Sequence, residues 1–311
     1  METALCRVCD TQLKGGFTFR EMMFGFRDRF NYGQCPNCQS LQILQVPANI
    51  DKYYPSYYVA FAQEIASLKR LPFLKRVFVK SRIRKKFEQG RNHELEYLKP
   101  INIMPDAHIL DIGCGRGALI CGLYNLGYEK VGGVDKFIPS EIDYGYGVKV
   151  QKKDLSELDS NAYDLLMMHH VLEHMDEQVK ELKECYRLLK KNGVLLIRIP
   201  VIGTAWDIYQ ENWVQLDAPR HFVLHTLKSM NILAEKTGFV IEKTIFDSNE
   251  FQFWGSELYK KDIPLTLPDT HEWYPVNKTF SNEQIERYKQ EAIKLNVEQK
   301  GDAAMFYLRK K

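Results

Sequence analysis

The chain has 311 residues, of which 45% are hydrophobic and 27% are charged, and its formal net charge at pH 7 is +3. This composition is that of an ordinary globular protein, and the length allows one large domain with a smaller one. The weak positive charge gives no indication of nucleic-acid binding by itself. No apolar run approaches the roughly 20 residues that a membrane-spanning helix needs. The first ten residues, METALCRVCD, lack the features of a secretory signal, so we expect a cytoplasmic protein.

Residues 1–50 contain two C-x-x-C pairs, CRVC and CPNC, formed by Cys6, Cys9, Cys35 and Cys38. Two such pairs are typical of a structural zinc site with four thiolate ligands, whereas disulfides are rare in a reducing compartment. Four thiolates leave no open position on the metal, so we expect a zinc ribbon-like module that zinc helps to fold. Such a module could dock on its neighbour, shape a substrate entrance or hold a partner.

Residues 51–100 begin with the tyrosine-rich stretch DKYYPSYYVAF and continue into a strongly basic stretch, Lys69–Arg91. The simplest interpretation of this segment is a solvated helical linker. The alternatives are contact with an anionic acceptor, with an anionic membrane surface as a peripheral protein, or with RNA.

Residues 101–255 alternate apolar, strand-like runs with helical patterns. The runs are AHILDIG, EKVGGVD, YGVKVQKKD, YDLLMM and GVLLIRIP, and the clearest helical pattern is EQVKELKECYRLLKKNG, with a stop signal at Asn192 and Gly193. This order predicts an α/β fold with a doubly wound, mostly parallel sheet that binds ligands beyond the carboxyl ends of its strands. We expect residues 256–311 to form a C-terminal extension that completes the sheet or the substrate site.

A glycine-rich loop, DIGCGRGAL, follows the first of these strands. Its glycines are Gly113, Gly115 and Gly117, and Asp111 precedes them. Glycine permits tight turns and a close approach of the backbone to a ligand, and the helix that follows offers free N–H groups. The spacing G-x-G-x-G differs from the G-x-G-x-x-G of dinucleotide sites and suits a smaller adenosine cofactor. A tight turn that serves packing alone is the alternative.

Acidic residues close the next two predicted strands. Asp135 ends the second strand about twenty residues beyond the loop, where a carboxylate can accept hydrogen bonds from both ribose hydroxyls. Asp154 ends the third strand, in the sequence KKDL, where it could accept from an adenine amino group. Taken alone, Asp154 is an ordinary surface aspartate, and only its register with the other two groups suggests a binding role.

These motifs, in this order, resemble those of the class I S-adenosylmethionine-dependent methyltransferases. ILDIGCGRG, GVD, KKDL, YDLLMMHHVLEHM and LLKKNGVLLIRIP resemble their successive strand motifs over roughly residues 90–255. The resemblance implies a seven-stranded sheet with an antiparallel last strand, and a cofactor across the carboxyl ends of strands one to four. It also implies that the cofactor contacts Asp111, Gly113, Gly115, Gly117, Asp135, Asp154, Leu155 and His169.

The cluster HHVLEH matches the zinc-peptidase motif H-x-x-E-H from His170 to His174. A peptidase site would need both histidines on one continuous helix, and here they directly follow an apolar strand. We therefore expect a strand-to-helix corner that is not a metal site. Glu173 and His174 could tie this corner down by hydrogen bonds, or His174 could be a catalytic or substrate-orienting group.

A second candidate segment is ENWVQLDAPRHFVLHT, Glu211–Thr226. Arg220 could hold a phosphate or carboxylate of a substrate, and His221 could be a catalytic base. Nearby aromatic residues could wall the substrate site; these are Trp206, Tyr209 and Trp213. The alternative is a turn whose charges cap neighbouring elements.

The resemblance extends to zinc-ribbon methyltransferases among bacterial sugar-modifying enzymes. It implies O- or C-methylation of a sugar, a glycan precursor or another small anionic metabolite, possibly phosphate-bearing. One alternative is an RNA methyltransferase. The almost balanced set of charges in residues 1–50 argues against it. The other is a zinc-based interaction protein that has lost activity. The intact glycine loop and Asp135 argue against this alternative.

Overall fold

The computed structural model describes residues 4–55, 57, 58, 65, 67, 68 and 96–311. The basic stretch Lys69–Arg91 lies outside the described residues, so its interpretation as a linker, a membrane contact or an acceptor site stays a prediction. Within the described part of the chain, no helix combines the length and the apolar character that crossing a membrane requires.

The larger of two sheets has eight strands in the order β11-β12-β9-β8-β4-β5-β7-β6. Its parallel part contains β4 (His108–Ile112), β5 (Lys130–Val134), β7 (Lys149–Gln151), β8 (Tyr163–His169) and β9 (Leu189–Pro200). Antiparallel pairing adds β6 (Ile142–Asp143) at one edge and β12 (Ala303–Lys310) followed by β11 (Phe239–Phe246) at the other. The strand order reverses at β4, which pairs with β5 on one side and β8 on the other.

The predicted doubly wound, mostly parallel sheet is therefore confirmed, with one strand more than the resemblance implied. The additional strand is the two-residue β6, which pairs back on β7 because the chain turns between Asp143 and Lys149. The antiparallel strand is β12, which lies between β9 and β11. A segment from the end of the sequence thus completes the interior of the sheet.

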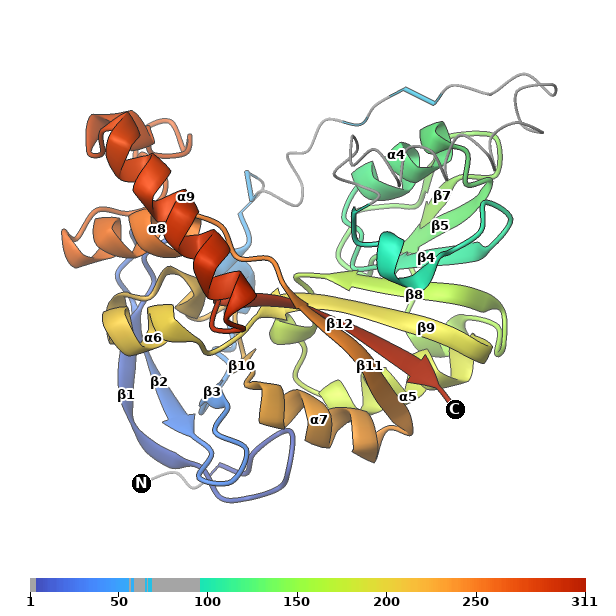
Figure 1. The fold of residues 1–311 in the computed structure, drawn as a ribbon, viewed down its shortest axis with the longest axis horizontal. Helices are drawn as coiled ribbons and strands as arrows, with labels where there is room; N and C mark the ends of the chain where they lie inside the picture. The colour runs from blue at the N-terminus through green and yellow to red at the C-terminus, as the bar shows by residue number, and fades with distance from the viewer. Residues whose placement is uncertain (1–3, 56, 59–64, 66, 69–95) are drawn as a thin grey trace.

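Helices cover both faces of this sheet (Figure 1). The connecting helices are α4 (Ala118–Leu126), α5 (Gln178–Leu188) and α7 (Leu227–Lys236). Along β8, Leu165 and Met167 pack into the core on the α4 side, whereas Leu166 and Met168 pack into the core on the α5 side. Burial on both faces explains why the strand is a continuous apolar run and not an alternating one.

The predicted stop of the helical pattern at Asn192 and Gly193 is wrong. Helix α5 ends at Leu188, and Leu189 already pairs with Tyr163 of β8 as the first residue of β9. Asn192 adopts a positive φ of 63° within β9. The pairing of β9 with β8 thus outweighs the local helical preference of Lys190 and Lys191.

The smaller sheet has the strand order β1-β2-β3-β10. Residues 1–50 supply β1 (Lys14–Arg20), β2 (Arg29–Gln34) and β3 (Leu41–Ile43). Its fourth strand, β10 (Val223–Leu224), comes from the segment after β9 and pairs antiparallel with β3. One continuous hydrophobic core includes residues of this sheet and of the large one, so the N-terminal module is built into the rest of the protein.

The aromatic residues proposed as a substrate wall belong to that shared core. Trp213 is fully buried, and Trp206 and Tyr209 are each 6% exposed. The Trp206 ring packs edge-on against Phe17 and Phe19 of β1. These side chains therefore join the two sheets and do not face an acceptor.

The remaining helices lie mostly around the N-terminal module. They are α6 (Thr204–Tyr209), α8 (Phe251–Lys260) and α9 (Asn282–Val297), with α8 and α9 above the module in Figure 1. Short 3-10 turns join the elements: η1 (Ile50–Tyr53), η2 (Lys99–Ile101), η3 (Leu155–Glu157), η4 (Leu172–His174), η5 (Gln210–Asn212), η6 (Val214–Leu216) and η7 (Val276–Lys278).

Candidate functional site

The glycine loop between β4 and α4 has a backbone that side chains would disrupt. Gly113, Gly115 and Gly117 have φ values of +66°, +53° and +84°. A Cβ at Gly113 would lie 2.7 Å from Val171, and one at Gly117 would lie 2.7 Å from Val150. The positive φ values and these close approaches require glycine, so the loop leaves an uncovered backbone cradle at the carboxyl end of β4.

Asp135 closes β5 beside this loop. Its Oδ2 accepts a hydrogen bond from the Gly115 N–H at 2.9 Å, and its Oδ1 accepts one from the Phe137 N–H at 2.8 Å. Both bonds fix the carboxylate at the switch point of the sheet. Its position fits the expected contact with ribose hydroxyls.

Asp111 lies beneath the loop and is 4% exposed. Burial and the neighbouring charge of Asp135 raise the pKa of Asp111 to about 8. The group is therefore mainly protonated at neutral pH and can donate a hydrogen bond. A positively charged ligand beside it would favour its ionised form.

Asp154 lies three residues beyond the end of β7, and His169 is the last residue of β8. The Asp154 carboxylate caps η3 by accepting from the Ser156 N–H and hydroxyl, and Leu155 behind it is buried. This local role accounts for the aspartate without a ligand. At His169, burial and the charge of Arg198 lower the pKa to about 3, and among the described residues its Nε2 has no hydrogen-bond partner. His169 thus presents a neutral ring at the cofactor side.

A second group of polar residues gathers where β8, the segment after β9 and the N-terminal module meet, and we call it the buried corner. It consists of Glu21, Glu173, His174, Asp217, Arg220 and His221. As expected, the chain turns sharply after β8: His170 has a positive φ of 55°, and η4 is a single turn. His170 and His174 therefore do not share a continuous helix. The predicted strand-to-helix corner is present.

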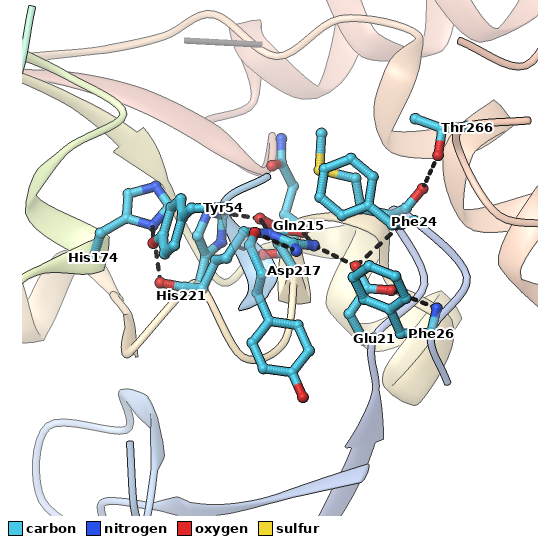
Figure 2. Close-up of polar contacts among 12 residues, drawn as sticks. Glu21, Phe24, Phe26, Tyr54, His174, Gln215, Asp217, His221 and Thr266 are labelled. Carbon is cyan, nitrogen blue, oxygen red and sulfur yellow. Dashed lines mark hydrogen bonds and ion pairs between the residues drawn. The ribbon is translucent and has the colours of Figure 1, made fainter. Parts of the chain in front are cut away.

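The two histidines of the corner have defined proton positions. His174 Nδ1 lies 2.8 Å from the Arg220 carbonyl oxygen, and His221 Nδ1 lies 2.7 Å from the Gln215 carbonyl oxygen. Because a carbonyl oxygen only accepts, each Nδ1 must carry the proton and donate it. Each neutral ring then has its lone pair on Nε2. The ring centroids are 4.8 Å apart, and Figure 2 shows the two rings side by side.

Arg220 is fully buried and does not face an acceptor. Its Nη2 donates to Glu21 at 2.8 Å and to Asp217 at 2.5 Å, and its Nη1 donates to the Tyr53 carbonyl oxygen. Burial opposes the ionisation of Asp217, but the guanidinium outweighs it and lowers the pKa of Asp217 to about 2. The geometry therefore contradicts the expectation that Arg220 holds a substrate phosphate. Instead, Arg220 joins the segment of His221 to the N-terminal module through Glu21.

Glu173 lies beside both histidines and is fully buried. Among the described residues, neither of its carboxylate oxygens has a hydrogen-bond partner, although His170 Nδ1 lies 3.4 Å from Oε1. Burial raises the pKa of Glu173, but opposing effects, led by the contact with His170, outweigh burial and lower it to about 2. The corner thus contains an ionised carboxylate without a full set of partners.

The four cysteines of the N-terminal module converge in space. Cys6 Sγ lies 3.6 Å from Cys38 Sγ, and Cys9 Sγ lies 3.4 Å from Cys35 Sγ. All four sulfur atoms can be placed within 4.8 Å of one another. Sulfur atoms bound to zinc at about 2.3 Å in a tetrahedron lie roughly 3.8 Å apart, so the arrangement fits such an ion.

The sequence and the fold agree with one family of known proteins. A family model described as a methyltransferase domain matches residues 80–244, which is more than half of the chain. The chain belongs to this methyltransferase family. It is an S-adenosylmethionine-dependent methyltransferase, and the glycine cradle and Asp135 are the groups that fit this cofactor.

Named relatives of the methyltransferase act on different acceptors. The ubiquinone biosynthesis O-methyltransferase of Bradyrhizobium diazoefficiens is 22% identical over 203 residues, which cover 57% of this chain and 76% of that protein. The tRNA U34 carboxymethyltransferase of Helicobacter pylori is 25% identical over 51% of this chain and 63% of that protein. The chain therefore spans less than two thirds of the second relative.

Solved structures of methyltransferases also resemble this chain. Phosphoethanolamine N-methyltransferase 2 of Haemonchus contortus, solved with S-adenosyl-L-methionine, is 19% identical with a TM-score of 0.44, covering 71% of this chain and 52% of that one. A methyltransferase of Archaeoglobus fulgidus is 22% identical with a TM-score of 0.41, covering 76% and 94%.

Two residues, one in the buried corner and one beside it, were not predicted from the sequence. Glu21 has no motif around it, and only its ion pair with Arg220, across almost two hundred residues, reveals its role. Tyr54, whose hydroxyl lies 3.1 Å from His174 Nδ1, belongs to the tyrosine-rich stretch that the sequence did single out. The abundance of tyrosine there was the only available signal.

Proposed function

We propose that this methyltransferase methylates a hydroxyl oxygen of a small acceptor, with a sugar or glycan precursor as the favoured class. The observation that carries the proposal is the pair of imidazoles at the buried corner, whose Nδ1 atoms both donate to backbone carbonyl oxygens. His174 and His221 both keep a lone pair on Nε2. Their corner adjoins the glycine loop, because Val171 of the same turn packs against Gly113.

The chemistry follows from these two features. Bound S-adenosylmethionine supplies an electrophilic methyl group, and transfer then depends on the alignment of an oxygen with that methyl. The loop and Asp135 hold the cofactor side, whereas the corner accepts the proton that the hydroxyl must lose. Burial lowers the pKa of His174 to about 4, so His174 is a weak base and we assign the proton-accepting role to His221.

The relatives support acceptors of this kind without identifying one. The Bradyrhizobium diazoefficiens relative is named as an O-methyltransferase, which agrees with a hydroxyl acceptor. C-methylation would use the same base, because an acidic carbon also loses a proton. A phosphate on the acceptor would need a cation other than Arg220, which is enclosed.

We also propose that the four cysteines bind a structural zinc ion. The sulfur separations support this assignment, and so do N–H groups that point at the sulfurs. Gln42 donates to Cys6 Sγ at 3.0 Å, and the Val8 N–H donates to the same atom. Such hydrogen bonds stabilise thiolates. All seven cysteines are free, as a reducing cytoplasm would keep them.

The N-terminal module, in this proposal, holds the catalytic corner in place. Glu21 of the module pairs with Arg220, and the Tyr32 hydroxyl donates to the His221 carbonyl oxygen at 2.9 Å. The strand β10, next to His221, completes the sheet of the module. Residues 1–50 then serve the active site directly, residues 101–255 supply the cofactor domain, and residues 256–311 complete its sheet.

A methyl-transfer assay tests the proposed function. The full chain is incubated with labelled S-adenosylmethionine and a panel of nucleotide-sugars, sugar phosphates and phenolic acceptors, with transfer RNA as a separate arm. We expect label in a small hydroxylated acceptor, and a loss of at least about 100-fold in kcat for His221→Asn. Label in RNA alone, or in an amine alone, would overturn the proposal.

A further inference from the structure

Three lone-pair donors converge at the buried corner, and the proposed methyl transfer does not by itself explain their arrangement. Glu173, His174 and His221 can each place one donor atom within 4.8 Å of the other two. Glu173 and His221 are almost completely inaccessible, with exposures of 0% and 6%. The three groups come from η4 and from the segment after β9, so two separate parts of the chain meet at this point.

The hydrogen bonds around the three groups leave no proton between them. His174 Nδ1 and His221 Nδ1 both donate to backbone carbonyl oxygens, which leaves an acceptor lone pair on each Nε2. The carboxylate of Glu173 is a third acceptor, and in the described part of the chain its nearest donor is His170 Nδ1, at the long distance of 3.4 Å. Each of the three residues offers one ligand atom within 4.8 Å of the others, and a buried carboxylate whose ion-pair partner is a single half-exposed histidine is costly, so a positive charge among the three groups would be favourable.

We infer that Glu173, His174 and His221 form a second metal site, which binds a divalent transition-metal ion. Two imidazoles and one carboxylate are a common protein ligand set for such ions, with the remaining coordination positions open. The hydrogen bonds from Nδ1 to backbone carbonyl oxygens are the outer contacts that normally orient metal-bound histidines.

The adjacent groups agree with this assignment. The Tyr54 hydroxyl lies 3.1 Å from His174 Nδ1, the nitrogen that carries the proton, so this contact does not occupy the lone pair on Nε2. Asp217 Oδ2 lies 3.8 Å from His221 Nε2, but both Asp217 oxygens already accept from Arg220. His170 Nδ1 contacts Glu173 at 3.4 Å, yet its ring is 40% exposed and lies outside the cluster.

This site is distinct from the four-cysteine site in position and in chemistry. The cysteine site offers four sulfur ligands and no open position, whereas the corner offers nitrogen and oxygen ligands from three residues. An ion bound to His221 would occupy the lone pair that the proposed base uses, so it would take over that role by lowering the pKa of a hydroxyl bound to it. Only this last consequence depends on the proposed methylation of a hydroxyl; the binding of the ion does not.

Metal content distinguishes the two sites. The full-length wild type and its variants are loaded with zinc, freed of excess ion by dialysis, and measured by mass spectrometry of the metal. We expect Glu173→Gln and His221→Asn to retain one zinc ion fewer per chain than the wild type. The control His108→Gln, at the start of β4 and far from both clusters in the fold, should retain as much as the wild type. Equal zinc content in all four proteins would overturn the inference.

A second measurement uses only the wild type, so it tests the site even if the variants fail to fold. The protein first receives one equivalent of zinc, which occupies the four-cysteine site, and is then titrated with Co²⁺. We expect saturable binding with visible d–d absorption and without a thiolate-to-cobalt charge-transfer band. An absorption spectrum dominated by thiolate charge transfer, or no saturable binding, would count against the site.

The result is separable from the fate of the proposed function. If the protein binds a second metal ion but methylates no acceptor of the panel, the metal site is supported and the proposed function is not. The opposite outcome is a protein that retains only the cysteine-bound ion, transfers methyl groups and is not inhibited by a chelator. It would support the proposed function and exclude the second metal site.

Discussion

The cofactor side of the sheet and the buried corner adjoin the same turn after β8, but they are assembled in different ways. At the cofactor side, the loop glycines and Asp135 come from one strand–loop–helix–strand stretch, and the Asp135 carboxylate is held by backbone N–H groups. At the corner, Glu21, Glu173 and Arg220 come from three distant segments and are fully buried. Changes at the cofactor side should therefore alter ligand affinity, whereas changes at the corner should alter stability and geometry together.

The largest effect is expected from the cysteine cluster that supports the corner. Cys35→Ser should abolish zinc binding at the four-cysteine site and unfold the module, because zinc contributes roughly 10 kcal/mol or more to the folding of such sites. Activity should fall with it, since the module holds Arg220 through Glu21. Zinc content and thermal melting measure these losses. The control Cys121→Ala, in the core beside α4, should keep its zinc.

The next largest effect on stability is expected from the buried ion pair of Arg220 with Glu21. Arg220→Met should lower the free energy of unfolding by about 3–5 kcal/mol, because it leaves the buried carboxylate of Glu21 without its partner. Denaturant titration measures this change. Arg27→Met removes an arginine from an exposed ion pair with Asp262 and should cost less than about 1 kcal/mol. Similar losses for both variants would contradict the special role of the corner.

The two regions should respond to pH in opposite directions. Burial lowers the pKa of His225, near the corner, from 6.5 to about 4 despite the opposing charge of Glu173. The unfolded chain therefore binds the proton more readily, and this contribution to stability is lost as pH falls from about 6.5 towards 4.

Asp111 has the opposite sign, because its pKa is raised from 3.8 to about 8 in the fold. Its contribution is present at low pH and is lost as pH rises through that interval. His225→Gln should thus remove a loss of stability that occurs as pH falls from about 6.5 to 4, by up to about 3 kcal/mol, and Asp111→Asn a loss that occurs as pH rises from about 4 to 8, by up to about 6 kcal/mol. Melting temperatures measured across pH without cofactor test both signs. A variant that changes the slope of stability against pH with the opposite sign would refute its assignment.

The smallest effect on stability is expected at Asp135. Asp135→Ala should weaken S-adenosylmethionine binding by about 10- to 100-fold, since a hydrogen bond to a charged group is worth about 1.5–3 kcal/mol. The melting temperature of the protein without cofactor should change little. Calorimetric titration measures the affinity, with Asp143→Ala, an exposed aspartate paired with Lys149, as the control. Undiminished affinity would remove Asp135 from the cofactor site.

The same contrast explains how much the sequence could predict. The glycine loop and Asp135 are close in sequence, and the parallel strands β4 and β5 bring them together, so local pattern was sufficient. The C-x-x-C pairs were recognisable for a similar reason, because each pair forms its own tight turn. Periodicity also predicted the sheet, and it failed where pairing of Leu189 with Tyr163 ended α5 early.

The corner could not be predicted in the same way. Whether Arg220 faces solvent depends on Glu21, and nothing in the sequence relates these two residues. An arginine beside a histidine in a loop suggests substrate binding, but Arg220 is fully buried and therefore supports the structure. The aromatic residues Trp206 and Trp213 were misassigned for the same reason, because Trp206 packs against a module folded from a distant segment and Trp213 packs against Trp206.

The pairing of β10 with β3 has a practical consequence for anyone who divides this protein. Residues 1–50 look like a detachable unit, yet their sheet needs Val223 and Leu224 as its fourth strand. A fragment that begins after residue 50 would expose that strand as an open sheet edge and leave the guanidinium of Arg220 without Glu21. Such a fragment should aggregate when expressed. Crystallisation, truncation and fusion designs should therefore keep the module and the methyltransferase domain on one polypeptide.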